Sequence, residues 1–283
     1  MRYILLGTGG PRLSQRRRGT AHVVLFDDEG LMIDCGPGTT YRLHEAGVAA
    51  ESIRYLFLTH HHYDHIADYG HFALTRWDHT SQPSPLDVFG PPNTARITDL
   101  LFGTDGVYHG DILARTEHPM SQGIFAIRGG KLPRPMPEVW AHDVAQGLVF
   151  ETARWRMLAG PARHAEPFLV CYSYRLETPE RTVVFSGDCG DYAPLAAFAR
   201  GADTLIHMCT WPDDVLERYG MRDYAGGPGA AGQAAAAAGV RKLVLTHAHA
   251  PAWDTPEGMA EAVAQAARHF GGEIVFAQDL AEI

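Results

Sequence analysis

Histidine and aspartate alternate in one short segment of the chain. Residues 58–65 read Leu-Thr-His-His-His-Tyr-Asp-His, so a strand-like run ends in the spacing His-x-His-x-Asp-His. Alternate side chains at a strand end share one face, so His60 and His62 can reach one cation, while the following turn brings Asp64 and His65 toward a second. The alternative is a solvated polar turn. The spacing favours a site for two metal ions.

The composition agrees with a metal-binding protein of the cytoplasm. The 283 residues include 16 histidines, the commonest transition-metal ligand, and only four cysteines, which lie far apart. The chain has 33 acidic and 24 basic residues, which gives a net charge of −9. This negative charge disfavours nucleic acid as a partner, although local basic patches are compatible with it. No uncharged apolar run of 18 residues occurs, so we expect no membrane segment.

Short β-rich runs alternate with helical patterns along the chain. Ten runs predict strands, at residues 3–6, 22–26, 31–34, 55–58, 155–158, 168–176, 182–185, 204–207, 242–246 and 273–276. Helices are predicted over 38–46, 230–238 and 255–270, the last with Thr255 as N-cap and Gly271 as its end. This order predicts an α/β fold with two sheets. Because no repeat or linker interrupts it, we expect one domain over residues 1–283.

Residues 103–137 are an exception to this regular order. Six glycines and four prolines punctuate the segment too densely for long regular elements. We expect an ordered excursion that forms a wall of the substrate pocket, because long loops in compact domains are often functional. A plain surface loop and an oligomer contact, as in a homodimer, are the alternatives.

Over nearly its whole length the chain resembles the metallo-β-lactamase superfamily of dinuclear metallohydrolases. The His-x-His-x-Asp-His segment and the glycine-containing runs at residues 6–11 and 31–39 match this family in order. His164, Asp188 and His247 fall where the family places its third histidine, its bridging aspartate and its final histidine. The resemblance implies an αββα sandwich of two mixed β-sheets with helices on the outer faces. It also implies that Asp34 supports the metal loop.

The resemblance further implies a set of metal ligands. One ion would bind His60, His62 and His164, the other would bind Asp64, His65 and His247, and Asp188 would bridge the two. Such nitrogen and oxygen ligands suit two divalent ions, Zn²⁺ best, with Mn²⁺ or Fe²⁺ as alternatives. Taken singly, His164 and His247 would be interpreted as structural histidines, and Asp188 as an ordinary turn residue. Their order along the chain and their local sequence context favour metal ligands instead.

Within the superfamily the chain is most similar to the tRNA 3′-processing endonuclease and arylsulfatase-like branch. Two departures stand out. Where those nucleases carry His-Glu-Ala-Thr, this chain reads His207-Met208-Cys209-Thr210, so the carboxylate of the proton relay is missing. A second family histidine is absent from residues 224–229. With the net charge, these departures weaken the prediction of a nuclease.

We therefore expect a metal-dependent hydrolase that uses a metal-bridging hydroxide on a small, anionic or cyclic ester, lactone or amide. Asp64 would orient the nucleophile, and His207 or a metal-bound water would protonate the leaving group. Trp77, Trp211 and Tyr224 are the candidate substrate-binding side chains. A phosphodiesterase or tRNA-processing nuclease is one alternative, and iron-dependent oxygen chemistry on the same fold is another.

Overall fold

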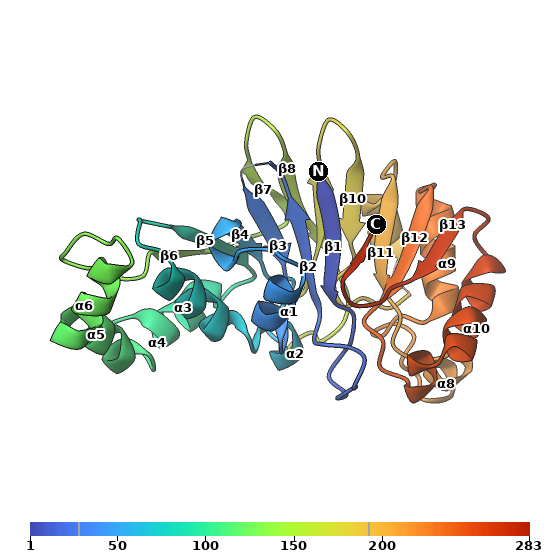
Figure 1. Cartoon of the computed structure of the whole chain (residues 1–283). Helices are drawn as coiled ribbons and strands as arrows, with labels where there is room; N and C mark the ends of the chain where they lie inside the picture. Colours follow the sequence, from blue (N-terminus) through green and yellow to red (C-terminus); the bar gives the residue numbers. More distant parts are fainter. Residues whose placement is uncertain (28, 192) are drawn as a thin grey trace.

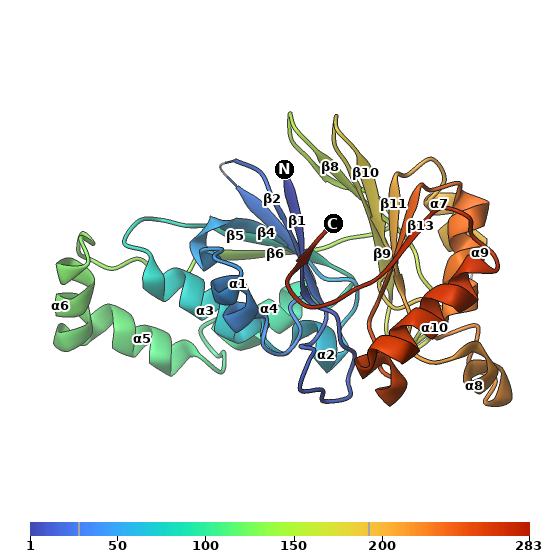
Figure 2. The same ribbon diagram turned by 45° about the vertical axis from the view of Figure 1, so that its right-hand side comes forward.

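Two β-sheets lie face to face in this protein, each with helices on its outer side (Figures 1 and 2). The structure is a computed structural model that describes residues 1–27, 29–191 and 193–283. Both sheets are mixed and seven-stranded. The predicted αββα sandwich is therefore confirmed.

The first sheet is built almost entirely from the N-terminal half of the chain. Its order is β14 (Ala281–Glu282), β1 (Arg2–Gly7), β2 (Ala21–Leu25), β3 (Gly30–Ile33), β4 (Ile53–Phe57), β5 (Leu86–Gly90) and β6 (Val139–Asp143). The strands from β1 to β3 are antiparallel, whereas those from β3 to β6 are parallel. The carboxyl ends of β3 and β4 therefore meet at one edge.

The second sheet comes from the C-terminal half. Its order is β13 (Glu273–Phe276), β12 (Lys242–Thr246), β11 (Thr204–Met208), β10 (Thr182–Phe185), β9 (Tyr172–Glu177), β8 (Arg156–Pro161) and β7 (Gly147–Glu151). Strands β10 to β13 are parallel. Their carboxyl ends thus also share one edge.

Alternation along the strands divides the apolar side chains among three layers. Between the sheets lie large buried rings such as Phe57, Tyr174 and Phe185, whereas Val184, next to Phe185, faces the helices. Helices α1 (Thr39–Glu45), α3 (Tyr69–His79) and α4 (Thr94–Phe102) cover the first sheet. Helices α7 (Ala193–Phe198), α9 (Pro228–Ala238) and α10 (Pro256–Ala267) cover the second.

Short helical turns complete the fold. They are η1 (Ala50–Ser52), α2 (Tyr63–Ile66), α8 (Asp213–Arg218) and η2 (Pro251–Asp254). Within the described ranges, no helix has both the length and the apolar character needed to cross a membrane.

Most predicted elements are present, with shifted bounds. The strand expected over 168–176 begins only at Tyr172, because the amides of Phe168 and Leu169 donate to the Ala165 carbonyl and form a turn. The Thr255 N-cap is confirmed, since its hydroxyl accepts from the Gly258 amide at 3.1 Å, but the helix ends at Ala267. Strands β5, β6, β7 and β14 were not predicted. Polar residues interrupt or shorten the apolar patterns of β5 and β6, whereas the apolar run of β7 has only three residues and β14 is two residues long.

The expectation that residues 103–137 lack longer regular elements is wrong. They contain two nine-residue helices, α5 (His109–Glu117) and α6 (Pro119–Ile127). Pro119 opens α6, where an amide hydrogen would have no helical acceptor. Gly110 and Gly123 lie inside the helices, and this position costs only helix propensity.

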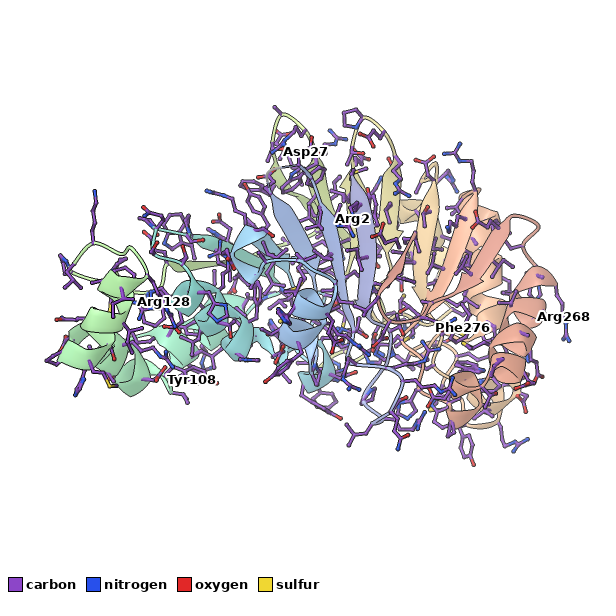
Figure 3. The ribbon with its side chains drawn as sticks, in the orientation of Figure 1. Arg2, Asp27, Tyr108, Arg128, Arg268 and Phe276 are labelled. Carbon is purple, nitrogen blue, oxygen red and sulfur yellow. The ribbon has the colours of Figure 1, made fainter. Side chains whose placement is uncertain are left out.

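This helical pair lies at one end of the molecule. Tyr108 and Arg128, which flank it, lie at the end opposite Arg268 (Figure 3). Arg128 and Arg134 both approach the carboxylate of Asp78 on α3, the latter at 2.9 Å. The indole of Trp77 donates to the Pro135 carbonyl at 3.0 Å. The end of α3 thus anchors the pair to the sandwich.

Candidate metal centre

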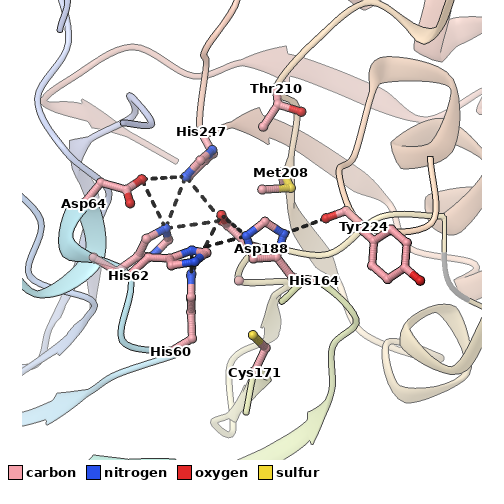
Figure 4. Close-up of polar contacts among 12 residues, drawn as sticks. His60, His62, Asp64, His164, Cys171, Asp188, Met208, Thr210, Tyr224 and His247 are labelled. Carbon is pink, nitrogen blue, oxygen red and sulfur yellow. Dashed lines mark hydrogen bonds and ion pairs between the residues drawn. The ribbon is translucent and has the colours of Figure 1, made fainter. Parts of the chain in front are cut away.

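All seven predicted ligands lie together at one edge of the sandwich. The side chains of His60, His62, His164 and Asp188 form one group, and those of Asp64, His65 and His247 form a second. Within each group the ligand atoms lie within 4.8 Å of one another. Figure 4 shows the rings and carboxylates turned toward one common centre. The fold therefore joins residues that are up to 187 positions apart in the sequence.

Strand ends position these side chains. His60 and His62 follow β4, and Asp64 and His65 belong to α2. From the second sheet, His164 follows β8, Asp188 follows β10 and His247 follows β12, so both sheets contribute.

Asp188 lies between the two groups. Its Oδ2 is 3.5 Å from His164 Nε2 and 3.9 Å from His60 Nε2. Its Oδ1 is 3.3 Å from Nε2 of both His65 and His247. One carboxylate oxygen thus faces each group, as a bridging ligand requires.

Contacts behind the rings determine which nitrogen faces the centre. The Asp34 carboxylate accepts from His65 Nδ1 at 2.8 Å and from the Thr59 amide at 2.8 Å. His164 Nδ1 donates to the Tyr224 carbonyl at 2.6 Å. In each case the opposite nitrogen is left for a cation, which is the arrangement that orients metal-binding histidines.

Burial and neighbouring charges control the protonation of these groups. Burial and the His65 ring lower the pKa of His60 well below its usual value, so this imidazole is neutral. For His65, burial acts in the same direction, but the carboxylates of Asp188 and Asp34 outweigh it and raise the pKa. Burial alone would raise the pKa of Asp188, yet the nearby histidines hold it well below its usual value. The Asp188 carboxylate is therefore ionised.

The donor atoms fit two divalent cations. His60 Nε2 and His62 Nδ1 are 2.9 Å apart, and the Nε2 atoms of His65 and His247 are 3.2 Å apart. Asp188 Oδ1 is buried and accepts no hydrogen bond within the described part of the chain. A cation in each group would satisfy these converging lone pairs, and imidazole with carboxylate suits divalent transition metals.

Glycines near the centre provide space that the sequence reasoning missed. A Cβ atom on Gly10 would lie 2.7 Å from Cε1 of His247, and one on Gly36 would lie 2.1 Å from the Asp64 carbonyl oxygen. The sequence shows the glycines at positions 7, 9 and 10 only as part of the run that resembles the family. The contact of Gly10 with a ligand is a property of the fold, and no local pattern could indicate it.

The structure does not bring His207 to the substrate side. Its ring has no exposed surface, and Nδ1 donates to the Met208 carbonyl at 2.7 Å. A Cβ on Gly226 would lie 3.0 Å from the ring, so the Gly226 loop covers it. Burial also lowers the pKa of His207, so the ring is neutral near pH 7 and lacks the second proton that a general acid would donate.

Of the three residues predicted to bind substrate, Tyr224 has a described hydrogen bond to the cluster, which His164 donates to its backbone carbonyl. Trp77 is buried under Arg134 in the anchor of α5 and α6, so its ring is not free to contact a substrate. The anchoring contacts of residues 103–137 are with α3, and the role of this segment as a pocket wall stays a prediction. Trp211 is half-buried and its ring lies 5.0 Å from that of His249, two residues after His247.

Comparison with known proteins agrees with this geometry. The model of the Beta-lactamase superfamily domain matches residues 30–248. The chain belongs to the metallo-β-lactamase superfamily. It is 33% identical over 282 residues to Ribonuclease Z of Mycobacterium sp. strain KMS, across 98% of this chain and 93% of that protein. With Ribonuclease Z of Mycobacterium bovis strain BCG / Pasteur 1173P2 it shares 31% identity over 283 residues, across 98% of this chain and 95% of that protein.

Solved structures share the fold at lower identity. The metallo-β-lactamase fold protein YhfI from Bacillus subtilis has a TM-score of 0.74 at 19% identity, with 100% of this chain and 98% of that chain covered. The short form of human tRNase Z has a TM-score of 0.67 at 20% identity, with the same coverage. This superfamily member is a metal-dependent hydrolase in the tRNA 3′-processing branch.

The expectation that nucleic acid is not a partner is wrong, because the relatives that match this chain end to end are ribonucleases. Net charge was the misleading signal. It sums the whole surface, whereas substrate binding depends on local charge. Exposed Arg16 and Arg18 lie on the loop between β1 and β2, and half-buried Arg163 directly precedes His164.

Proposed function

We propose that this protein is a zinc-dependent phosphodiesterase that cleaves RNA at tRNA 3′ ends. The observation that supports it most strongly is the match to Ribonuclease Z over 98% of the chain. The seven assembled side chains agree with it, because two-metal centres are typical of enzymes that cleave phosphodiesters. A cytoplasmic setting, which the sequence predicts, is part of this proposal.

Seven side chains would hold the two ions, in the groups described above. When bound, the ions would polarise the phosphoryl group and lower the pKa of water enough to supply hydroxide near neutral pH. Asp64 is ionised because the His247 and His65 rings lower its pKa by more than burial raises it. Its carboxylate can therefore accept a hydrogen bond and orient the attacking water. Asp34 and the Tyr224 carbonyl keep His65 and His164 in position.

The position after His207 has no carboxylate to pass a proton. Met208 occupies it, and its sulfur accepts from the Gly226 amide at 3.3 Å. A thioether has no proton to give, so the leaving oxygen takes its proton from water. General acid–base catalysis accelerates a reaction by about 10²–10⁴-fold. We therefore expect kcat to be lower, by a factor of about this size, than in enzymes that have the relay carboxylate.

The direct test compares wild type with one ligand variant and one matched histidine variant. Zinc-loaded protein is assayed on a tRNA precursor with a 3′ trailer and on bis(p-nitrophenyl) phosphate. We expect His62→Gln to lower kcat/KM on both by about 100-fold or more. His142→Gln, a half-exposed histidine on β6, should leave both unchanged.

Two measurements would contradict the proposal. The first is failure to cleave the trailer together with turnover of a lactone or carboxylic ester. This result would show that the protein is a small-molecule hydrolase. Elemental analysis of protein purified without added metal tests the choice of Zn²⁺, and iron with oxygen uptake would refute it.

A further inference from the structure

An aromatic side chain stands almost free in solvent on a loop that carries one of the candidate ligands. Phe168 is 90% exposed, although phenylalanine is usually buried. It lies on the loop between β8 and β9 that carries His164. Tyr224, whose carbonyl binds His164, is also 41% exposed.

The loop holds Phe168 in this position. The amides of Phe168 and Leu169 donate to the Ala165 carbonyl at 3.0 and 3.2 Å, so residues 165–169 form a closed turn. Leu169 packs against the core beside α7, α9 and α10, and the Tyr172 amide donates to Thr59 across the sheets at 2.9 Å. The exposure of Phe168 is therefore a result of the backbone, and its ring is presented to solvent by an anchored turn.

Neighbouring groups also hold Tyr224 in place. Its carbonyl faces His164 while its ring turns away from the ligands (Figure 4). The guanidinium carbon of Arg163 lies 5.0 Å from the centre of that ring, and Arg163 Nη2 is 3.4 Å from the tyrosine hydroxyl. The Arg163 side chain is 41% exposed, and its Nη1 lies 3.5 Å from the exposed Asp223 carboxylate. Exposed ion pairs of this kind are weak, so a phosphate can compete for the guanidinium.

We propose that Phe168 and Tyr224, together with Arg163, form a base-stacking platform for the nucleotide next to the scissile phosphodiester. The inference rests on the proposed function and specifies its substrate contact. Every nucleobase has a face that stacks on an exposed aromatic ring, and guanidinium groups bind phosphate oxygens. All three residues are tied to His164: Arg163 by sequence, Tyr224 by a hydrogen bond, and Phe168 by the same loop.

The chemistry of the platform predicts its selectivity. Phe168 has no polar atom that could read a base edge, and the hydroxyl of Tyr224 is near Arg163. Stacking without edge recognition tolerates any sequence. The platform therefore selects unpaired RNA over small phosphodiesters, and does not select among the bases.

The test combines protein variants with RNA probes. Phe168→Ala and Phe168→Trp are compared with wild type and with Leu148→Ala, an equally apolar, exposed residue on β7. Substrates are a tRNA precursor, the same RNA with an abasic nucleotide on either side of the cleavage site, and bis(p-nitrophenyl) phosphate. The readouts are kcat/KM and the Kd for RNA.

We expect Phe168→Ala to raise the Kd for RNA by about tenfold, to affect the small phosphodiester far less, and to be rescued by Phe168→Trp. An abasic nucleotide should weaken binding to wild type by a similar factor and add little to Phe168→Ala. RNA cleavage with equal Kd values for wild type and Phe168→Ala would overturn the platform alone. Absence of RNA cleavage by wild type would overturn the proposed function, and the platform with it.

Discussion

Replacing Gly10 by alanine tests whether His247 is a metal ligand without changing the ligand itself. The new Cβ would lie 2.7 Å from Cε1 and 3.0 Å from Nδ1 of the imidazole. Ordinary contact begins at 3.4 Å, so the ring must withdraw by about 0.7 Å. It has little room, because Asp64 and Asp188 oxygens lie 3.3 Å from its Nε2.

Metal–ligand distances tolerate deviations of about 0.2 Å, several times less than this displacement. We therefore expect Gly10→Ala to lower the affinity of the Asp64, His65 and His247 group for its metal ion by about 10–100-fold. Mutation of residues that orient metal ligands typically has an effect of this size. The metal content after dialysis should fall from about two ions per chain toward one. The value of kcat on the tRNA precursor should fall with it.

Gly110→Ala is the matched control. Gly110 lies in α5 and has no described atom within 4 Å of its Cβ position. Alanine there should leave metal content and kcat unchanged and stabilise the protein by about 0.5–1 kcal/mol. Dialysis against graded chelator followed by elemental analysis measures both variants. Two tightly held ions and normal turnover in Gly10→Ala would refute the role assigned to His247.

Three further substitutions test other contacts. Asp34→Ala removes the acceptor of His65 Nδ1, so metal affinity measured in metal-buffered dialysis should fall by about 10–100-fold, and an unchanged affinity would contradict the orienting role. Trp77→Ala should lower the free energy of unfolding in urea by about 3–5 kcal/mol with kcat/KM unchanged, whereas altered catalysis at normal stability would return Trp77 to the substrate pocket. Burial would raise the pKa of Asp78, but the Arg134 hydrogen bond and other arginines outweigh it and lower the pKa, so its stabilisation is present above about pH 4 and is lost below. Asp78→Asn should therefore lower Tm at pH 7, and the difference from wild type should close as the pH falls below about 4; an equal difference at pH 3 would contradict this.

The convergence of the first four candidate ligands could be predicted from the sequence because these residues are local. His60, His62, Asp64 and His65 lie within six residues, and the strand and turn between them determine their directions. His164, Asp188 and His247 could be proposed only through family resemblance, since no local pattern joins residues so far apart.

Other features required the fold itself. The burial of His207 depends on a loop 19 residues later, and the role of Trp77 depends on Pro135 and Arg134. Helices α5 and α6 were hidden because glycine and proline lower helix propensity, yet proline is tolerated in a first turn and glycine at an exposed position.

The division of the chain between the two sheets also divides the metal centre. Strands β1 to β6 precede β7 to β13, and only β14 returns to the first sheet. A cut between β6 and β7 would give one fragment with His60, His62, Asp64 and His65 and another with the remaining three ligands. Neither fragment would hold a complete set for either ion, so their association would depend on the free metal concentration. Such a split chain would act as a two-part reporter, in which restored hydrolase turnover signals an available divalent metal.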